Sequence, residues 1–362
     1  MALGAFRGQF MVLPLLVLAT TASAQSGPYQ TKELAPGVYA VLREPPGRIS
    51  DSNVLVIIND EDVVVVDANI LPASASEVVA EIRRLTPKPV RYVVNTHWHS
   101  DHHYGNHVYQ AAFPGVEFIQ HVETRRLVVE RDIPTLPKNV NTEYPAIIER
   151  YKKALATGKT STGADVTPEL RKSVEEMLPI YQQFVDQMGK SPVVPGTLLV
   201  RDSLVLVRGE RTIVVKHLGR GNTPGDLVVH LPKERIVAAG DLDVAPIPFS
   251  FYSHLGDWPT TLRNLKALDV ATIMPGHGPL QTDWTYVDQL IALIESTWTQ
   301  VKAAVDAGAD LEATRKRVNL EAFRDRFAGT DERRRSGFTS LFVTPAVESA
   351  FNELKTGTPF GK

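Results

Sequence analysis

The stretch of sequence with the clearest chemistry is NTHWHSDHHYGN, residues 95–106. Besides one aspartate, Asp101, it contains four of the chain's ten histidines: His97, His99, His102 and His103. The chain has no cysteine, so any metal ion must be bound by His, Asp, Glu or Asn rather than by thiolate. The spacing predicts that His97 and His99 bind one divalent cation. Asp101 and His102 follow in the next turn, where they are expected to serve a second cation beside the first.

The elements before this cluster are predicted to carry it to one edge of a sheet. The β-branched run DVVVVDAN predicts a strand that ends at Asp67. A helix follows, with Ser74 and Glu77 placed as a capping box. The run VRYVVNTH, residues 90–97, predicts the next strand, which delivers His97 and the rest of the cluster at its end.

The same order of elements recurs in the second half of the chain. RIVAAGD predicts a strand that ends at Asp241, a helix follows, and ATIMPGH predicts a strand that ends at His277. We interpret this recurrence as an internal repeat. Two β-rich halves with helices outside predict an α/β fold, a four-layer αββα sandwich, in which the strand ends that carry Asp and His meet at one edge.

Three further segments flank or interrupt these halves. Residues 1–24 are predicted to be a secretory signal peptide, because Arg7 precedes a short apolar run and a small-x-small cleavage site. The main domain, 25–282, includes a helical insertion at about 141–190, which is either a hairpin packed on the core or a lid over the site. Residues 283–362 are predicted to form a C-terminal helical extension.

Charge and apolar patterning restrict the partners. Loss of Arg7 with the signal peptide changes the formal net charge from −2 to −3, and no basic run is present, so a nucleic-acid partner is not expected. No later segment has a long apolar run, so no membrane association is expected after signal cleavage. We expect a periplasmic or secreted protein with a small-molecule substrate. The oligomeric state stays open.

Five motifs, in order, resemble those of the metallo-β-lactamase superfamily: VVVVDAN, THWHSDH, GRGNTPGD, AAGDLD and MPGHG. The resemblance extends over roughly residues 35–280 and implies the metallo-β-lactamase fold with Zn²⁺ as cofactor, two ions in all. This fold hosts many reactions, so the motifs are more specific for the fold than for the substrate.

The resemblance also assigns the ligands of each ion. His97 and His99 match the ligands of the first zinc. The second zinc is expected on Asp101, His102 and His277. Asp241 matches the carboxylate that bridges both ions. The residues alone leave two other roles open, because Asp241 could cap a turn and His277 could bond to backbone.

The chain departs from the family pattern at Asn222, where the third ligand of the first zinc is usually histidine. Asparagine offers a neutral carbonyl oxygen, which is a weaker zinc ligand than imidazole. Asn222 then ligates the first zinc weakly, or turns its amide NH₂ toward the substrate, or leaves the first site poorly filled so that the second acts alone. We expect two zinc ions with a weak first position.

Other residues are expected to support the ligands or line the pocket. Asp67 and His103 are predicted behind the metal loop, where they hydrogen-bond to it without touching a metal. The loop DVAPIPFSFYSH follows Asp241 and supplies three candidate pocket residues: Phe249, Phe251 and Tyr252. Ordinary packing of a proline-rich loop is the alternative.

The predicted activity follows from the resemblance. It implies a zinc-dependent hydrolase that uses metal-bound hydroxide on a carboxylic derivative, namely a β-lactam, a lactone or an ester. Asp101 is the expected catalytic residue, because it would orient the hydroxide. Two other classes remain: an iron-dependent thiol oxidoreductase of the same fold, and a metal-binding protein without catalysis.

Overall fold

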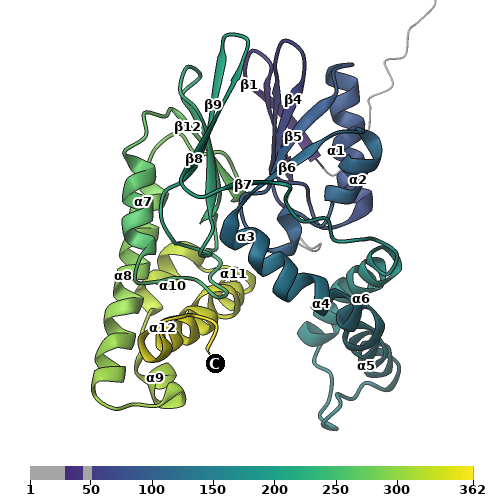
Figure 1. The fold of residues 1–362 in the computed structure, drawn as a ribbon. Coiled ribbons are helices and arrows are strands. Elements are labelled where there is room, and N and C mark those ends of the chain that lie inside the picture. The colour runs from purple at the N-terminus through teal and green to yellow at the C-terminus, as the bar shows by residue number, and fades with distance from the viewer. Residues whose placement is uncertain (1–28, 44–50, 362) are drawn as a thin grey trace, which may run out of the picture.

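Two β-sheets face each other at the centre of the computed structural model, which describes residues 29–43 and 51–361 (Figure 1). The strands of the first sheet lie in chain order: β1 (Tyr29–Ala35), β2 (Val38–Arg43), β3 (Val54–Ile58), β4 (Val63–Val66), β5 (Val90–Val94), β6 (Glu117–His121) and β7 (Leu198–Val200). The second sheet has the order β12-β11-β10-β9-β8, with bounds β8 (Ser203–Arg208), β9 (Arg211–His217), β10 (Leu227–Leu231), β11 (Ile236–Val244) and β12 (Thr272–His277).

The apolar pattern of strand β4 shows how these layers form. Val64 and Val66 belong to the core between the two sheets, whereas Val63 and Val65 belong to the core between the first sheet and its helices. Successive side chains of a strand point to opposite faces. A strand buried on both faces is therefore apolar at every position, which accounts for the continuous run of valines.

Helices cover the outer face of each sheet, so the layers are those of the predicted αββα sandwich (Figure 1). On the first sheet these are α1 (Pro72–Leu85) and α2 (Asn106–Ala112), and on the second α7 (Trp258–Lys266) and α8 (Thr285–Asp306).

The predicted capping box at the start of α1 is wrong. Pro72, with its φ already suited to a helix, is the first helical residue. Ser74 therefore lies inside the first turn, and its hydroxyl donates to Asp51 at 2.6 Å.

Each half contains the predicted strand–helix–strand unit. Strands β4 and β5 are parallel and joined through α1, and β11 and β12 are parallel and joined through α7. Two bounds differ from the prediction. β5 ends at Val94, so the histidine cluster lies in the loop after it, and Asp241 lies within β11 rather than at its end.

The helical segment between β6 and β7 is longer than the predicted 141–190. It begins at Val122 and contains α3 (Val122–Leu127), α4 (Ile133–Lys138), α5 (Tyr144–Thr157) and α6 (Pro168–Met188), with π-helical turns at Val128–Asp132 and Asn139–Glu143. The Tyr144 ring packs against Phe184, which joins α5 to α6. Gln187 of α6 accepts a hydrogen bond from the Ala73 amide at 3.0 Å, which joins this hairpin to α1.

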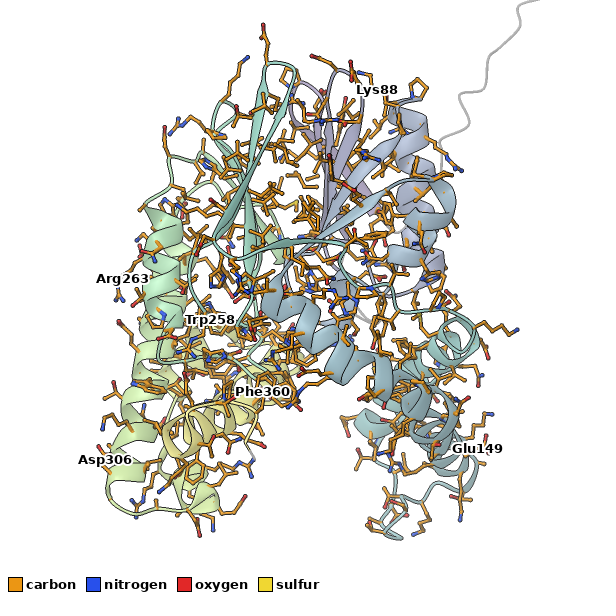
Figure 2. The ribbon with its side chains drawn as sticks, viewed as in Figure 1. Lys88, Glu149, Trp258, Arg263, Asp306 and Phe360 are labelled. Carbon is orange, nitrogen blue, oxygen red and sulfur yellow. The ribbon has the colours of Figure 1, made fainter. Side chains whose placement is uncertain are left out.

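The chain after β12 is helical, as predicted. Beyond α8 it forms α9 (Leu311–Arg317), α10 (Glu321–Ala328), α11 (Glu332–Gly337), a π-helical turn (Phe338–Val343) and α12 (Thr344–Thr356). Phe360 lies below the sheets, between the two helical groups that end near Asp306 and Glu149 (Figure 2). No helix in the described ranges is long and apolar enough to cross a membrane. Residues 1–24, the predicted signal peptide, lie outside those ranges.

Candidate metal centre

The loop that follows β5 is held in place by Asp67, the residue after β4. Asp67 has a left-handed backbone conformation, with φ of 66°. Its Oδ1 accepts a hydrogen bond from the Thr96 amide at 2.8 Å, and its Oδ2 lies 2.8 Å from His102 Nδ1. The carboxylate thus fixes the ring orientation of His102 and leaves Nε2 directed away from Asp67.

A second support comes from His103. Its Nε2 lies 2.8 Å from Asp132 Oδ2 and 3.0 Å from the carbonyl oxygen of Trp98. Because Asp132 belongs to the helical segment, His103 joins the histidine loop to that segment. Asp67 and His103 therefore lie where the sequence analysis places them, in contact with the loop.

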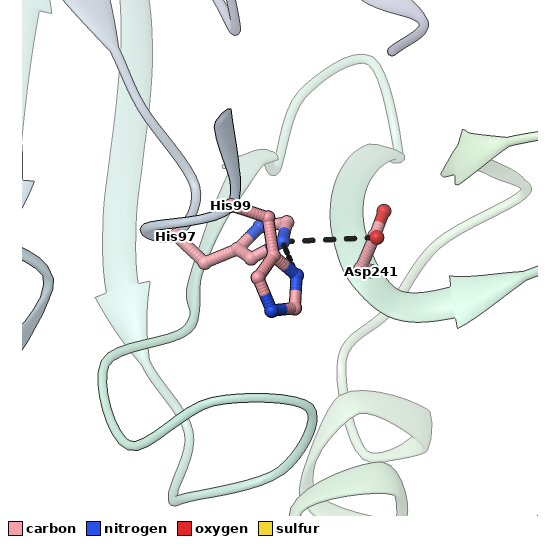
Figure 3. Close-up of side chains that lie close together, drawn as sticks. All are labelled: His97, His99 and Asp241. Carbon is pink, nitrogen blue, oxygen red and sulfur yellow. Dashed lines mark hydrogen bonds and ion pairs between the residues drawn. The ribbon is translucent and has the colours of Figure 1, made fainter. Parts of the chain in front are cut away.

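The first group of possible ligands combines both halves of the chain (Figure 3). His97 and His99 come from the loop after β5, and Asp241 comes from β11. His97 Nε2 lies 2.9 Å from His99 Nδ1 and 3.7 Å from Asp241 Oδ2. One ligand atom from each of the three residues lies within 4.8 Å of the others.

The second group lies directly beside the first and consists of Asp101, His102 and His277. Asp101 Oδ2 is 3.4 Å from His102 Nε2 and 2.9 Å from His277 Nε2. Asp241 joins the two groups: its Oδ1 lies 3.3 Å from His102 Nε2 and 3.6 Å from His277 Nε2, while its Oδ2 faces His97. The position of the Asp241 carboxylate requires a glycine at residue 276, because a Cβ added to Gly276 would lie only 1.9 Å from Asp241 Oδ1.

The donor set and its spacing fit zinc. Two ligands that are each about 2.1 Å from a tetrahedral zinc ion lie about 3.4 Å apart. Three distances match this spacing: Asp101 to His102 at 3.4 Å, Asp241 to His102 at 3.3 Å, and Asp241 to His277 at 3.6 Å. His102 Nε2 and Asp241 Oδ1 are also buried without a hydrogen-bond partner among the described residues. A buried polar atom left unpaired costs about 1–3 kcal/mol, and a cation between these two atoms would remove that cost.

The charged residues of the centre also favour a bound cation. Burial lowers the pKa of His102, but the carboxylates of Asp101, Asp67 and Asp241 outweigh burial and raise it well above its usual value. Burial likewise lowers the pKa of His277, and Asp241 and Asp101 outweigh it and raise that pKa. Burial, with His102 and His99 nearby, lowers the pKa of His97 well below its usual value, which keeps this imidazole in the neutral form that binds metals. The carboxylates therefore stabilise a positive charge between them, which a proton or a metal ion can supply.

Zinc affinity is accordingly expected to rise with pH. His102 and His277 keep their protons to a higher pH than free imidazole does, and each must release its proton to bind a metal. A competition titration with a chromophoric chelator should show tighter zinc binding at about pH 8 than at about pH 6. Equal affinity at the two pH values would contradict this assignment of ligands.

Asn222 lies in the loop between β9 and β10 and is fully buried. Its Oδ1 accepts a hydrogen bond from Ser253 Oγ at 3.1 Å. Its Nδ2 has no partner in the described part of the chain. Among the three outcomes considered above, this geometry favours the second, in which the amide NH₂ is available to the substrate.

An Asn222→His variant is expected to hold zinc more tightly at the first position, because imidazole replaces an amide whose oxygen already accepts a hydrogen bond. Elemental analysis after dialysis against metal-free buffer should show a higher zinc content than in the unchanged protein. Asn222→Ala is the matched control, because it removes the same side chain without adding a ligand, and its zinc content should not rise. Unchanged zinc content in Asn222→His would show that this position does not face the metal.

Aromatic side chains lie beside the ligands. The Phe249 ring is 5.4 Å from the His99 ring in an edge-on arrangement, and Phe251 is 4.7 Å from Phe249. Tyr252 is 6.1 Å from Trp98 and stacks on Phe360 at 5.2 Å. Phe251 and Tyr252 are among the exposed large apolar residues. All three predicted pocket residues therefore lie on one aromatic surface next to the histidine loop.

Sequence reasoning missed two members of this surface. Phe360 lies far along the chain from every motif, and the Arg131 guanidinium lies 4.1 Å from its ring centre. No local pattern marks either residue. Only the fold brings the helical segment and the C-terminal region together beside Trp98, which is 6.2 Å from Phe360.

Comparison with known proteins agrees with this arrangement. A sequence model of the metallo-β-lactamase superfamily matches residues 47–277, more than half of the chain. The chain belongs to the metallo-β-lactamase superfamily. The motif resemblance and the fold expected from it are thereby confirmed.

The proteins to which this chain is similar include two sulfatases and a metallo-β-lactamase. A linear primary-alkylsulfatase from Pseudomonas sp. (strain ATCC 19151) is 24% identical over 228 residues, which is 60% of this chain and 40% of the relative. A double mutant of the sec-alkyl sulfatase PisA1 superposes with a TM-score of 0.62 at 14% identity, over 91% of this chain and 50% of that one. A metallo-β-lactamase from Pontibacter korlensis superposes with a TM-score of 0.52 at 17% identity, over 74% and 99%. The structural likenesses show the fold.

Proposed function

We propose that this protein is a zinc-dependent hydrolase with a two-cation centre, acting on a carboxylic derivative such as a β-lactam, a lactone or an ester. The observation that carries the proposal is the position of Asp241, whose two oxygens face two adjacent groups of ligands. Such a shared carboxylate is suited to holding two cations side by side. The superfamily match supports a metal-dependent hydrolase in general terms.

Zinc held by these residues would supply Lewis acidity and would lower the pKa of a water molecule to about 7. The chain's own residues do the rest. Asp101 accepts a hydrogen bond from the attacking water, orients it toward the substrate and carries a proton to the leaving group. Asn222 donates from Nδ2, which has no hydrogen-bond partner among the described residues, to the oxygen on which negative charge develops.

The aromatic surface supports a substrate with an apolar substituent. Phe249 lies against the His99 ring, and Phe251 and Tyr252 are exposed beside it. Aromatic rings contact the apolar groups of a substrate, and its polar atoms then face the metal centre. The carbonyl group would thus lie at the ligands while the substituent lies on these rings.

A second candidate reaction is the hydrolysis of alkyl sulfate esters. The observation that favours it is the similarity to the two sulfatases described above. An alkyl chain would bind the same aromatic surface as the substituent of a carboxylic ester. The two candidates differ in the group that is attacked and share the same centre.

A chelator-reversible activity screen, combined with elemental analysis of the purified protein, tests the proposal. The panel contains a β-lactam, aryl esters, lactones and alkyl sulfates. Zinc in the protein, with turnover of a carboxylic substrate that stops on chelation and returns with zinc, is the expected result. Turnover of alkyl sulfates alone would select the second candidate. Iron with dioxygen uptake on a thiol compound, or full zinc loading with no turnover, would replace the hydrolase by one of the other two classes.

A further inference from the structure

A third group of possible cation ligands lies outside this centre, where the loop after β11 meets the C-terminal helices. His254 and Asp257 belong to the loop before α7, and Glu353 belongs to α12. One ligand atom from each of these residues lies within 4.8 Å of the others. None of the three belongs to a motif of the superfamily, and the proposed reaction does not use them.

The imidazole of His254 is buried, and the described part of the chain supplies no hydrogen bond to its ring. His254 is 4% exposed, and neither of its ring nitrogens has a hydrogen-bond partner within the described ranges. Buried polar side-chain atoms are nearly always paired. Its Nδ1 lies 3.4 Å from Glu353 Oε1, which is close to the ligand–ligand distance of about 3.4 Å around a tetrahedral zinc ion.

A simple ion pair between His254 and Glu353 explains less of this geometry. It would leave Nε2 of His254 without a hydrogen-bond partner among the described residues. The carboxylates are also oriented from outside the group: Arg220 Nε donates to Asp257 Oδ2 at 2.6 Å, and the Gly256 amide donates to Glu353 Oε2 at 3.4 Å. Each carboxylate keeps further lone pairs for a metal.

The charge of the group also suits a divalent cation. Asp257 and Glu353 carry two negative charges, Arg220 carries one positive charge, and neutral His254 adds none. The sum is one negative charge, so a divalent cation is attracted. One imidazole and two carboxylate oxygens form a ligand set that zinc accepts, with water in the fourth position.

We propose that His254, Asp257 and Glu353 bind a third divalent cation of the zinc type, with a structural role. This cation joins α12 to the loop that precedes α7. The His254 amide donates to the Gly221 carbonyl oxygen at 2.8 Å, and Gly221 directly precedes Asn222. The third cation therefore braces the C-terminal helices against the segment that carries Asn222.

Zinc content measured on the full-length chain tests this site without reference to activity. The protein and its Glu353→Gln variant are loaded with zinc, dialysed against metal-free buffer and analysed for metal. The unchanged protein is expected to retain one zinc more per chain than Glu353→Gln, and added zinc is expected to raise its Tm more than that of the variant. Glu348→Gln is the matched control, because Glu348 is an exposed residue of the same helix and pairs with Arg315 at 2.8 Å. It should retain as much zinc as the unchanged protein.

Asp257→Asn provides an independent test, because this side chain is 44% exposed and its replacement leaves the interior intact. It too should lose one zinc. Equal zinc contents in the unchanged protein, Glu353→Gln and Asp257→Asn would overturn the third site. If those variants also keep chelator-reversible hydrolysis, the proposed function stands while the third site is rejected.

Discussion

An Asp101→Ala variant is expected to lose hydrolytic activity by at least about 10²–10⁴-fold, the range over which a positioned acid or base contributes. Asp101 Oδ2 lies between His102 and His277, at 3.4 and 2.9 Å from their Nε2 atoms. The substitution removes both the group that orients the attacking water and one ligand of the second cation. Steady-state kinetics with the substrate found in the screen measures the effect.

The fold should survive this change. Ser52 donates to the backbone oxygen of Asp101 at 2.9 Å, and that contact does not depend on the side chain. Circular dichroism and Tm should therefore remain close to those of the unchanged protein. Asp269→Ala serves as control, because this exposed aspartate pairs with Arg235 at 2.7 Å, away from the ligands. Activity retained in Asp101→Ala would defeat the mechanism.

Asp241→Asn is expected to weaken zinc binding at both positions. The second oxygen becomes an amide nitrogen, which is a donor, and the negative charge that both groups share is lost. Removal of a residue that merely supports a ligand costs about 10–100-fold in metal affinity, so the loss of a shared ligand should reach at least the upper end of that range. Elemental analysis after dialysis should show both zinc ions depleted.

Asp243→Asn is the matched control for that experiment. Asp243 lies two residues further along β11 and accepts a hydrogen bond from Gln281 at 3.1 Å. Burial raises its pKa to about 7, so the neutral amide is a close substitute for a carboxyl that is already partly protonated near neutral pH. Asp243→Asn should keep its zinc. A zinc content in Asp241→Asn equal to that of Asp243→Asn would exclude Asp241 as a shared ligand.

The sequence predicts the fold and the convergence of the two halves because the signals are local. The valine run of β4 marks a strand buried on both faces, and the order of elements around Asp67 and Asp241 repeats. Parallel strands joined by a helix then place their carboxyl ends at the same edge of each sheet. His277 could thus be expected near Asp101, although 175 residues separate them in the sequence.

Other features depend on contacts that no local pattern records. Pro134 and Pro137 would ordinarily end a helix, yet the chain stays helical from Val122 onward through π-helical turns, so the predicted start at about residue 141 is too late. The pairing of Ser253 with Asn222 and the stacking of Phe360 on Tyr252 join distant segments. They follow from the packed fold and not from residue spacing.

We expect two distant halves of the chain to hold two adjacent zinc ions through a shared Asp241. A crystal structure of the zinc-loaded protein, with anomalous difference maps recorded at the zinc edge, would show whether these ions are present. One peak is expected among His97, His99 and Asp241. Another is expected among Asp101, His102 and His277, about 3.5–4 Å from the first. An absence of zinc peaks between these residues in the zinc-loaded crystal would show that they do not form a two-zinc centre.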